Sequence, residues 1–334
     1  MRKFEALLAG CLFVLSMTPA AAETNTIHAS KQYGLSYLPL MIMEDQKLVE
    51  KHAAALGLKD INVTWVTLGG PNAMNDALLS GGLDFGAGGV PNLVTLWAKT
   101  RGTPTAVLGV GALNDMPVDL VSSNPNLKKL SDLSEKDKIA VTSVKISTQA
   151  LLLQMATAKE FGEANYDKYD SLTVSMPHPE AMTALMSGGI GINAHFSSPP
   201  FQYTELADPK IHKVLNNYEI LGGPATFNVV WGTTKFRNEN PKAYQAFFEA
   251  LKESIDIINK DKRKAAETYK RMANTKETVD FLLSILNDPL VNNTIEPHKT
   301  LPIAQFLAKV KRIPVAPAKW QDIWFPEVHS LHGS

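Results

Sequence analysis

Residues 77–87 read ALLSGGLDFGA, and residues 184–194 repeat nearly the same stretch as ALMSGGIGINA. Each copy begins as the apolar end of a helix and runs into Ser-Gly-Gly, whose glycines allow the left-handed turn that ends a helix. The residues that follow, 83–87 and 190–194, have the length of a buried strand. A helix–glycine–strand unit that occurs twice predicts two similar α/β lobes with a cleft between them. Chance recurrence of a glycine-rich loop is the alternative.

The composition is that of an ordinary globular protein with enough residues for two domains. The chain has 334 residues, of which 45% are hydrophobic and 20% are charged, as is usual for folded domains. Its 33 basic and 33 acidic residues cancel. A near-neutral chain has no general attraction for nucleic acid or for an anionic membrane surface. Neither is therefore expected as a partner.

The first 22 residues have the pattern of a secretory signal peptide. Two basic residues at positions 2 and 3 precede an apolar run from Ala6 to Met17, and three alanines follow at positions 20–22. The apolar run is too short for a permanent membrane span. We expect cleavage between Ala22 and Glu23, which leaves a mature protein in the periplasm.

Cys11 is the only cysteine in the chain. Because the stretch from Leu8 to Cys11 also resembles a bacterial lipobox, a lipid anchor on Cys11 is an open alternative to cleavage after Ala22. Cleavage after Ala22 removes this cysteine. The mature chain would then have no disulfide, no cysteine–metal site and no thiol nucleophile.

Strand-like and helix-like segments alternate along the chain, which predicts mainly parallel sheets covered by helices on both faces. Strands are expected at 26–29, 62–66, 83–87, 119–122, 139–141, 172–175, 190–194, 212–220 and 226–234. Helices are expected at 38–57, up to residue 79, at 148–161, and from residues 240, 262, 276 and 299. In the helix after Asn240, apolar side chains at helical spacing predict core positions. These are Tyr244, Phe247, Phe248, Leu251, Ile255 and Ile258.

The strand–helix pattern resets near Asn114 and again at Gly222-Gly223-Pro224, where glycine and proline interrupt it. These two points predict the chain crossings between lobes. Lobe one would combine residues 23–113 with residues 224–334, and lobe two would be the insert 114–223.

In open α/β sheets, ligands lie outside the carboxyl ends of the strands. Six loops follow expected strands in this way: 32–37, 69–72, 88–91, 143–149, 178–180 and 195–199. Several lead into helix N-termini, whose free N–H groups attract an oxyanion. The candidate ligand-binding residues are Gln32, Tyr33, Tyr37, Gly70, Asn72, Gly89, Ser143, Lys145, Ser147, His178, His195, Phe196 and Phe227.

The two histidines and the lysine among these candidates invite more specific interpretations. His178 and His195 could bind a ligand by hydrogen bonds, hold a metal or have a purely structural place. No His-x-x-x-His pattern or acidic cluster accompanies them, so no metal site and no cofactor is predicted. Lys145 is the one cation in the predicted loops and would suit a carboxylate, sulfonate or phosphate, although a solvated surface lysine is the alternative. The aromatic candidates could form pocket walls or pack beneath the loops.

Familiar catalytic motifs are missing from the sequence. It contains no Gly-x-Ser-x-Gly elbow, no Gly-x-x-x-x-Gly-Lys-[Ser/Thr] phosphate loop and no Gly-x-Gly-x-x-Gly after a strand. We therefore expect a binding protein and not an enzyme.

Several stretches in order resemble the periplasmic substrate-binding proteins of ABC importers, in the nitrate/sulfonate/taurine group (NitT/TauT, SsuA-like). They are Gln32-Tyr33-Gly34 after the first strand, residues 77–89, residues 130–141, and the second repeat at 184–194. The similarity covers essentially the whole mature chain. One position departs from the group's pattern, because Gly191 stands where an acidic residue is usual, and the predicted cleft loops contain no arginine.

The resemblance implies a type II periplasmic binding protein fold, with two αβα lobes and a ligand cleft between them. It implies the solute-binding component of an ABC importer, a monomer that captures a sulfonate, carboxylate or related small molecule. The partners would be a permease and its ATPase in the inner membrane.

Two alternatives from other functional classes stay open. A related group with the same fold makes the thiamine pyrimidine, with a cysteine-rich motif and a histidine that is consumed in the reaction; the missing cysteines argue against it. The other alternative is a sensor that presents its closed form to a membrane receptor.

Overall fold

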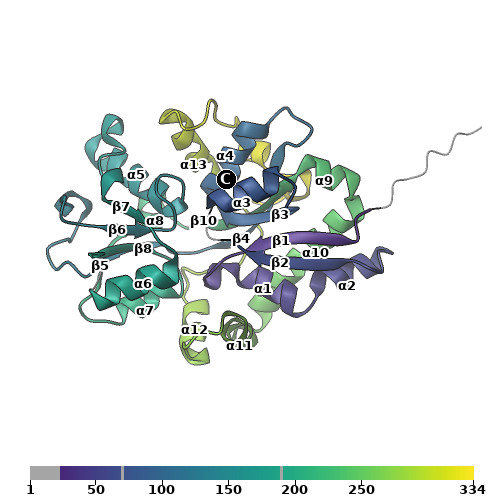
Figure 1. The fold of residues 1–334 in the computed structure, drawn as a ribbon, viewed down its shortest axis with the longest axis horizontal. Coiled ribbons are helices and arrows are strands. Elements are labelled where there is room, and N and C mark those ends of the chain that lie inside the picture. Colours follow the sequence, from purple (N-terminus) through teal and green to yellow (C-terminus); the bar gives the residue numbers. More distant parts are fainter. Residues whose placement is uncertain (1–22, 69–70, 189–190) are drawn as a thin grey trace, which may run out of the picture.

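A computed structural model describes residues 23–68, 71–188 and 191–334 of the chain, without the side chains of Pro71 and Asn72. The expected signal peptide, Cys11 and Gly70 lie outside these residues. Figure 1 shows two α/β lobes side by side, each built on its own sheet. Within the described residues, no helix has the length and apolar character needed to cross a bilayer.

The first sheet has the strand order β2-β1-β3-β10-β4. Its strands are β1 (Thr26–Lys31), β2 (Asn62–Thr67), β3 (Phe85–Gly89), β4 (Val107–Asp115) and β10 (Thr226–Thr233). β10 pairs antiparallel with both β3 and β4, whereas β1 is parallel to β2 and β3. Four strands therefore run in one direction, and β10, which comes from a distant part of the chain, runs in the other.

The second sheet repeats this topology with the order β7-β6-β8-β5-β9. Its strands are β5 (Asp119–Ser122), β6 (Ile139–Val141), β7 (Thr173–Ser175), β8 (Ala194–Ser197) and β9 (His212–Asn216). Here β5 is the antiparallel strand, between β8 and β9. β3 and β8, which each follow one copy of the repeated motif, hold the same central place in their sheets. The prediction of two similar, mainly parallel α/β lobes is confirmed.

Helices cover both sheets. The α-helices are α1 (Leu38–Asp45), α2 (Leu48–Ala55), α3 (Pro71–Leu79), α4 (Val90–Thr100), α5 (Thr148–Phe161), α6 (His178–Ser187), α7 (Phe201–Leu206), α8 (Asn217–Leu221), α9 (Thr234–Glu239), α10 (Pro241–Lys260), α11 (Lys262–Ala273), α12 (Val279–Leu286) and α13 (Thr300–Lys309). Short 3-10 helices are η1 (Leu35–Tyr37), η2 (Leu130–Asp132), η3 (Glu163–Asn165), η4 (Asp170–Leu172), η5 (Trp320–Ile323) and η6 (Pro326–Val328).

The largest helix, α10, packs its apolar stripe against the first sheet. All six positions predicted for the core, from Tyr244 to Ile258, are buried. The ring of Phe247 stacks on Phe85 of β3 with 3.8 Å between centroids. Stacking of this kind adds about 0.5–1.5 kcal/mol to the burial of the two rings.

Local features of the chain differ from the sequence expectations at several places, and the strand expected at 83–87 is β3, Phe85–Gly89. β1 continues to Lys31, because Ser30 and Lys31 stay in register with β2. The expected helix 38–57 is two helices, since Lys47 adopts a left-handed conformation with φ 50° between α1 and α2. The expected strand 212–220 ends at Asn216, whose side chain accepts a 2.7 Å hydrogen bond from the N–H of Tyr218 and starts α8.

The second copy of the motif also enters its sheet later than expected. β8 begins at Ala194, so a strand over 190–194 is wrong for the described residues of that range. The Asn193 side chain accepts a hydrogen bond from the Lys138 N–H at 2.9 Å and donates one to Asp137 at 2.8 Å. These bonds hold Asn193 in a loop, and the ladder starts at the next residue.

Two short segments carry the chain between the lobes, one between β4 and β5 and the other between α8 and β10. Asn217 ties the crossing after β4 to the start of α8. Its side chain accepts from the Val118 N–H at 2.9 Å and donates to the Met116 carbonyl at 3.1 Å. Because Met116 and Val118 are also fully buried, this crossing is a packed part of the core.

Candidate binding site between the two lobes

A cavity of about 60 Å³ lies between the two lobes. Lobe one, the part with the first sheet, lines it with Gln32, Tyr33, Ser36, Tyr37, Leu68, Gly88, Gly89, Asn92, Phe227 and Asn228. Lobe two, the part with the second sheet, lines it with Thr142, Ser147, Thr148, Gln149, Pro177, His178 and Ser198. Pockets for drug-sized ligands have about 300–1,000 Å³, so a ligand enclosed here would be small.

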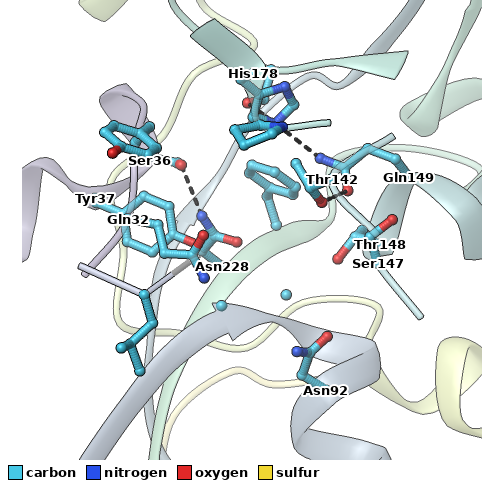
Figure 2. A pocket seen from close by; sticks show the side chains of 17 residues that line it. Gln32, Ser36, Tyr37, Asn92, Thr142, Ser147, Thr148, Gln149, His178 and Asn228 are labelled. Atoms are coloured by element: carbon cyan, nitrogen blue, oxygen red, sulfur yellow. Dashed lines mark hydrogen bonds between the residues drawn. The ribbon is translucent and has the colours of Figure 1, made fainter. Parts of the chain in front are cut away.

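The topology explains why these residues meet. Gln32 follows β1, Gly89 ends β3, Thr142 follows β6, and Ser198 follows β8. All four strands present their carboxyl ends to the cleft, the edge at which open α/β sheets bind ligands. In Figure 2 the labelled side chains surround one common space, with Asn92 on the opposite side of the view from His178.

The two lobes touch at Gly89 and Thr148. Gly89 is the N-cap of α4, and Thr148 is the first residue of α5. A Cβ atom on residue 89 would lie 1.7 Å from the Thr148 Oγ1 atom. Only glycine permits this approach, which brings the N-termini of α4 and α5 together across the cleft and so the positive ends of two helix dipoles.

The described lining of the cavity mixes polar and apolar groups and carries no lysine, arginine, aspartate or glutamate. Asn92 is 2% exposed, and its side chain makes no hydrogen bond to any residue that the structure describes. Nearby, Asn228 donates to the Ser36 hydroxyl at 2.8 Å. Burial raises the pKa of Tyr37, so its phenol stays neutral. The polar groups described in the walls of the cavity are therefore uncharged.

A chain of buried hydrogen bonds runs from the cavity into lobe two. Nε2 of His178 lies 3.0 Å from the Ser198 hydroxyl and 3.1 Å from the Gln149 amide nitrogen. Nδ1 of His178 lies 2.8 Å from Nε2 of His195, and Nδ1 of His195 lies 2.6 Å from a Glu205 carboxylate oxygen. The side chains of His195 and Glu205 are fully buried. We call Glu205, His195 and His178 the relay.

The hydrogen-bond partners of His178 at the cavity indicate which ring nitrogens of the relay carry protons. The Thr142 hydroxyl lies 3.1 Å from the Gln149 carbonyl oxygen, which turns the Gln149 N–H towards His178. Nε2 of His178 is then an acceptor, so its proton is on Nδ1 and is donated to His195, which in turn donates to Glu205. Burial lowers the pKa of His178 well below its usual range, because a charged imidazole is costly to bury. His178 itself is neutral.

A second cavity of about 300 Å³ adjoins the first and shares Gln32 and Tyr33 with it. Its lining is largely apolar and includes Met41, Met182, Phe201, Tyr269 and Met272. The Phe201 ring stacks on His178 at 5.5 Å between centroids. Because His178 lines the first cavity and Phe201 the second, this stacked pair separates the polar space from the apolar one.

The structure brings only part of the predicted candidates to the cavity. Seven line it: Gln32, Tyr33, Tyr37, Gly89, Ser147, His178 and Phe227. The Ser147 hydroxyl also caps α5, because it accepts from the Ala150 N–H at 3.2 Å. Tyr33 is 52% exposed at the cavity mouth.

The remaining candidates lie elsewhere or outside the described residues. His195 is behind His178, and Phe196, its neighbour on β8, is buried in the core. Ser143 and Lys145 do not line the cavity. Lys145 is exposed and has φ 65°. Asn72 is the second residue of α3, and its side chain is not described. Gly70 lies outside the described residues.

Sequence reasoning missed several residues of the site. Gln149 and Ser198 fall inside the predicted loops, whereas Asn92 lies one residue beyond one of them. Glu205 had no sequence signal, since it reaches His195 from α7 across the face of the sheet. Among the described residues, no group of three or more His, Cys, Asp or Glu side chains is arranged to hold a metal ion.

The strand order, the two lobes and the cleft between them are those of the periplasmic binding protein fold. The alkanesulfonate-binding protein SsuA from Xanthomonas axonopodis pv. citri, bound to MOPS, is similar with a TM-score of 0.71 and 17% identity over 91% of this chain and 99% of that one. The periplasmic nitrate-binding protein NrtA from Synechocystis PCC 6803 has a TM-score of 0.68 and 14% identity over 90% and 84%.

A Candida albicans protein described as having the generic periplasmic binding protein structural fold is also similar, with a TM-score of 0.64 and 14% identity over 89% of this chain and 93% of that one. No protein-family model and no curated protein matches the chain. At these identities the likeness establishes the shared fold.

Proposed function

We propose that this protein is the solute-binding component of an ABC importer, which encloses a small anionic or polar molecule between its lobes and releases it unchanged. One observation carries the proposal. Both lobes line the small first cavity and meet at Gly89 and Thr148 beside it. A ligand there would contact both lobes, so its binding would favour the closed arrangement over an open one.

The moving parts would be lobe one, residues 23–113 and 224–334, and lobe two, residues 114–223. The hinge would lie near Asn114 and Gly223, beside the two crossings. The bonds from Asn217 to Val118 and Met116 join the two crossings. They would keep the crossings together while the lobes rotate.

The fold neighbours support a class of ligand and partner. One neighbour binds alkanesulfonates and another binds nitrate, as their names state. For this chain we infer a sulfonate, carboxylate or related oxyanion, delivered in the periplasm by a monomer to an inner-membrane permease with its ATPase. The signal-peptide pattern of residues 1–22 supports export.

Thermal-shift screening of the mature protein tests this function. The panel contains sulfonates, carboxylates, nitrate and neutral polar compounds. A ligand at about 100 times its Kd adds roughly 2.7 kcal/mol to the free energy of unfolding. Small-angle scattering then checks closure, since a genuine ligand reduces the dimensions of the protein. If no compound stabilises the protein and none is carried through purification, the proposed function is wrong.

An enzymatic role has one observation in its favour, the contact of the Ser198 hydroxyl with His178. A hydroxyl bonded to an imidazole is the arrangement of an activated nucleophile. However, the Gln149 amide donates to the same imidazole nitrogen, which competes with transfer of the Ser198 proton. We therefore assign binding to this group. Mass spectrometry of the ligand after long incubation checks the assignment, because chemical conversion would contradict it.

A further inference from the structure

The relay has an unusual feature at its buried end. One oxygen of Glu205, Oε2, has no hydrogen-bond partner within the described chain, and the side chain is fully buried. An ionised carboxylate in such a place is costly unless its charge is balanced. His195 is the single partner that the structure gives it. With both imidazoles neutral, the relay has a net charge of −1.

One added proton would make the relay neutral and reverse its hydrogen bonds. The proton then lies on Nε2 of His178, Nε2 of His195 donates to Nδ1 of His178, and the charge of Glu205 is balanced by the proton that it shares with His195. The cavity end of the relay thereby changes from an acceptor into a donor. The Ser198 hydroxyl can then accept from His178 and turn its own hydrogen into the cavity, while the Gln149 amide, which lies 3.1 Å from the same nitrogen, turns its carbonyl oxygen towards His178.

We propose that the relay takes up one proton from solvent when an oxyanion binds in the cavity, so that anion affinity rises as the pH falls. This inference rests on the proposed function and specifies its ligand as an oxyanion. The described lining offers no lysine or arginine to balance an anion. Among the described residues next to the cavity, the relay can remove a negative charge and supply a donor with the same proton, whereas Tyr33 and Tyr37 are neutral donors already.

Few other titratable or charged side chains lie on the elements around the relay. The elements packed around it are β5, β6, β8, α5, α6 and α7. Besides the relay, they carry Asp119, Lys159, Glu160, Glu180 and Tyr203. Of these, Asp119 lies on the same face of the sheet as His195, because it pairs with Ser197 two residues further along β8. Asp119 is therefore the group to control for.

The binding test uses methanesulfonate, which stays ionised throughout, and its neutral analogue methanesulfonamide. Calorimetry is performed between about pH 5.5 and about pH 8.5, the range of histidine titration, in two buffers of different ionisation enthalpy. We expect the Kd of methanesulfonate to fall by up to about tenfold per pH unit of acidification. About one proton is taken up per bound ion at high pH. The neutral analogue should show no such dependence.

The decisive variant is Glu205→Gln. A glutamine N–H at this position can donate to His195, which permits the reversed, neutral arrangement of the relay without an added proton. We expect methanesulfonate to bind the variant at about pH 8.5 as tightly as it binds the unmodified protein at low pH, with no proton uptake. A Glu205→Gln protein that keeps the original pH dependence, or that loses anion binding while still folded, overturns the proposal.

If the relay takes up the proton, two control variants should still bind methanesulfonate more tightly as the pH falls. His52→Gln removes a histidine that contacts Glu253 at 2.7 Å, far from the cleft on α2 and α10. Asp119→Asn removes the neighbouring carboxyl. If Asp119→Asn abolishes the pH dependence, then Asp119 and not the relay takes up the proton.

One measurement needs no variant, in case Glu205→Gln fails to fold. Nitrogen-15 spectra of the histidine rings report which nitrogen carries the proton. In the unmodified protein at about pH 8.5, we expect Nε2 of His178 to be unprotonated, and saturation with methanesulfonate should protonate it. An unchanged spectrum with the ion bound contradicts the proposal. If no anion binds but a neutral compound does, the inference fails while the proposed function stands.

Discussion

The Cα of Gly89 lies so close to Thr148 that a Cβ at position 89 would be 1.7 Å from the Thr148 hydroxyl oxygen and 3.1 Å from its Cβ. The two residues belong to different lobes and start two helices. Their contact closes one side of the cavity. It depends on the absence of one methyl group.

Gly89→Ala should therefore weaken ligand binding by tenfold or more, which corresponds to about 1.4 kcal/mol. The backbone at this residue has φ −73° and ψ 155°, which alanine adopts without strain, so the added methyl acts mainly across the cleft. Calorimetry with the ligand from the screen measures the effect. Adding Thr148→Gly to the same protein should restore much of the affinity, and a lack of any rescue would place the damage elsewhere.

Asn92→Ala should weaken binding by about tenfold while leaving the unliganded protein nearly as stable as before. The amide is buried beside the cavity and makes no hydrogen bond to another described residue, so its loss breaks no bond of the free protein. A hydrogen bond to a ligand contributes about 0.5–1.5 kcal/mol, or more when the ligand is charged. Equal affinity in the variant would show that the ligand does not reach α4. Denaturant unfolding without ligand is the matched control.

Lys145→Ala should leave affinity unchanged. The side chain is exposed and lies outside the described cavity lining, although the sequence suggested a cation for an anionic ligand. Burial raises the pKa of Asp170, and the charge of Lys145 offsets part of that rise. Calorimetry with the ligand from the screen tests this, and a large loss of affinity would mean that the lysine reaches into the cleft.

His298→Gln should reduce the free energy of unfolding more at about pH 5.5 than at about pH 8.5. His298 Nδ1 lies 2.7 Å from Asp115 at the end of β4, and this bond raises the pKa of His298 above its usual value. A raised pKa gives stability that is fully present below the unfolded pKa and is lost as the pH rises through the folded one. Urea unfolding at both pH values tests the sign; a difference that grows with pH would contradict it.

The sequence predicted the architecture well and the site only in outline. The limits of α5, 148–161, agree with the prediction, and the repeated motif does lead into two equivalent strands. Periodicity and glycine stops carry that information, because they reflect local geometry. β4 was not expected as a strand, since Gly109 and Gly111 interrupt its apolar run. Gly109 lies where a Cβ would be 2.3 Å from the ring of Trp324, a contact with the far end of the chain.

The loops that line the cavity could be predicted because topology brings the ends of parallel strands together. Which side chains turn inward could not. The contact of His195 with Glu205 depends on the path of α7 after β8, and the contact of Gly89 with Thr148 depends on how far the lobes close. No characteristic spacing of residues in the sequence marks either contact. Lys145 is the opposite case, a predicted site residue that does not line the cavity. Its left-handed backbone and exposed side chain follow from the conformation of the loop, which its charge does not predict.

The position of β10 also has a consequence for the order in which the protein can mature. The strand sits between β3 and β4, so these two strands have no common neighbour until Thr226–Thr233 has been made. A nascent chain that stops short of this point carries a split sheet with open edges. The first sheet therefore cannot be completed until β10 is synthesised, more than a hundred residues after β4 ends at Asp115.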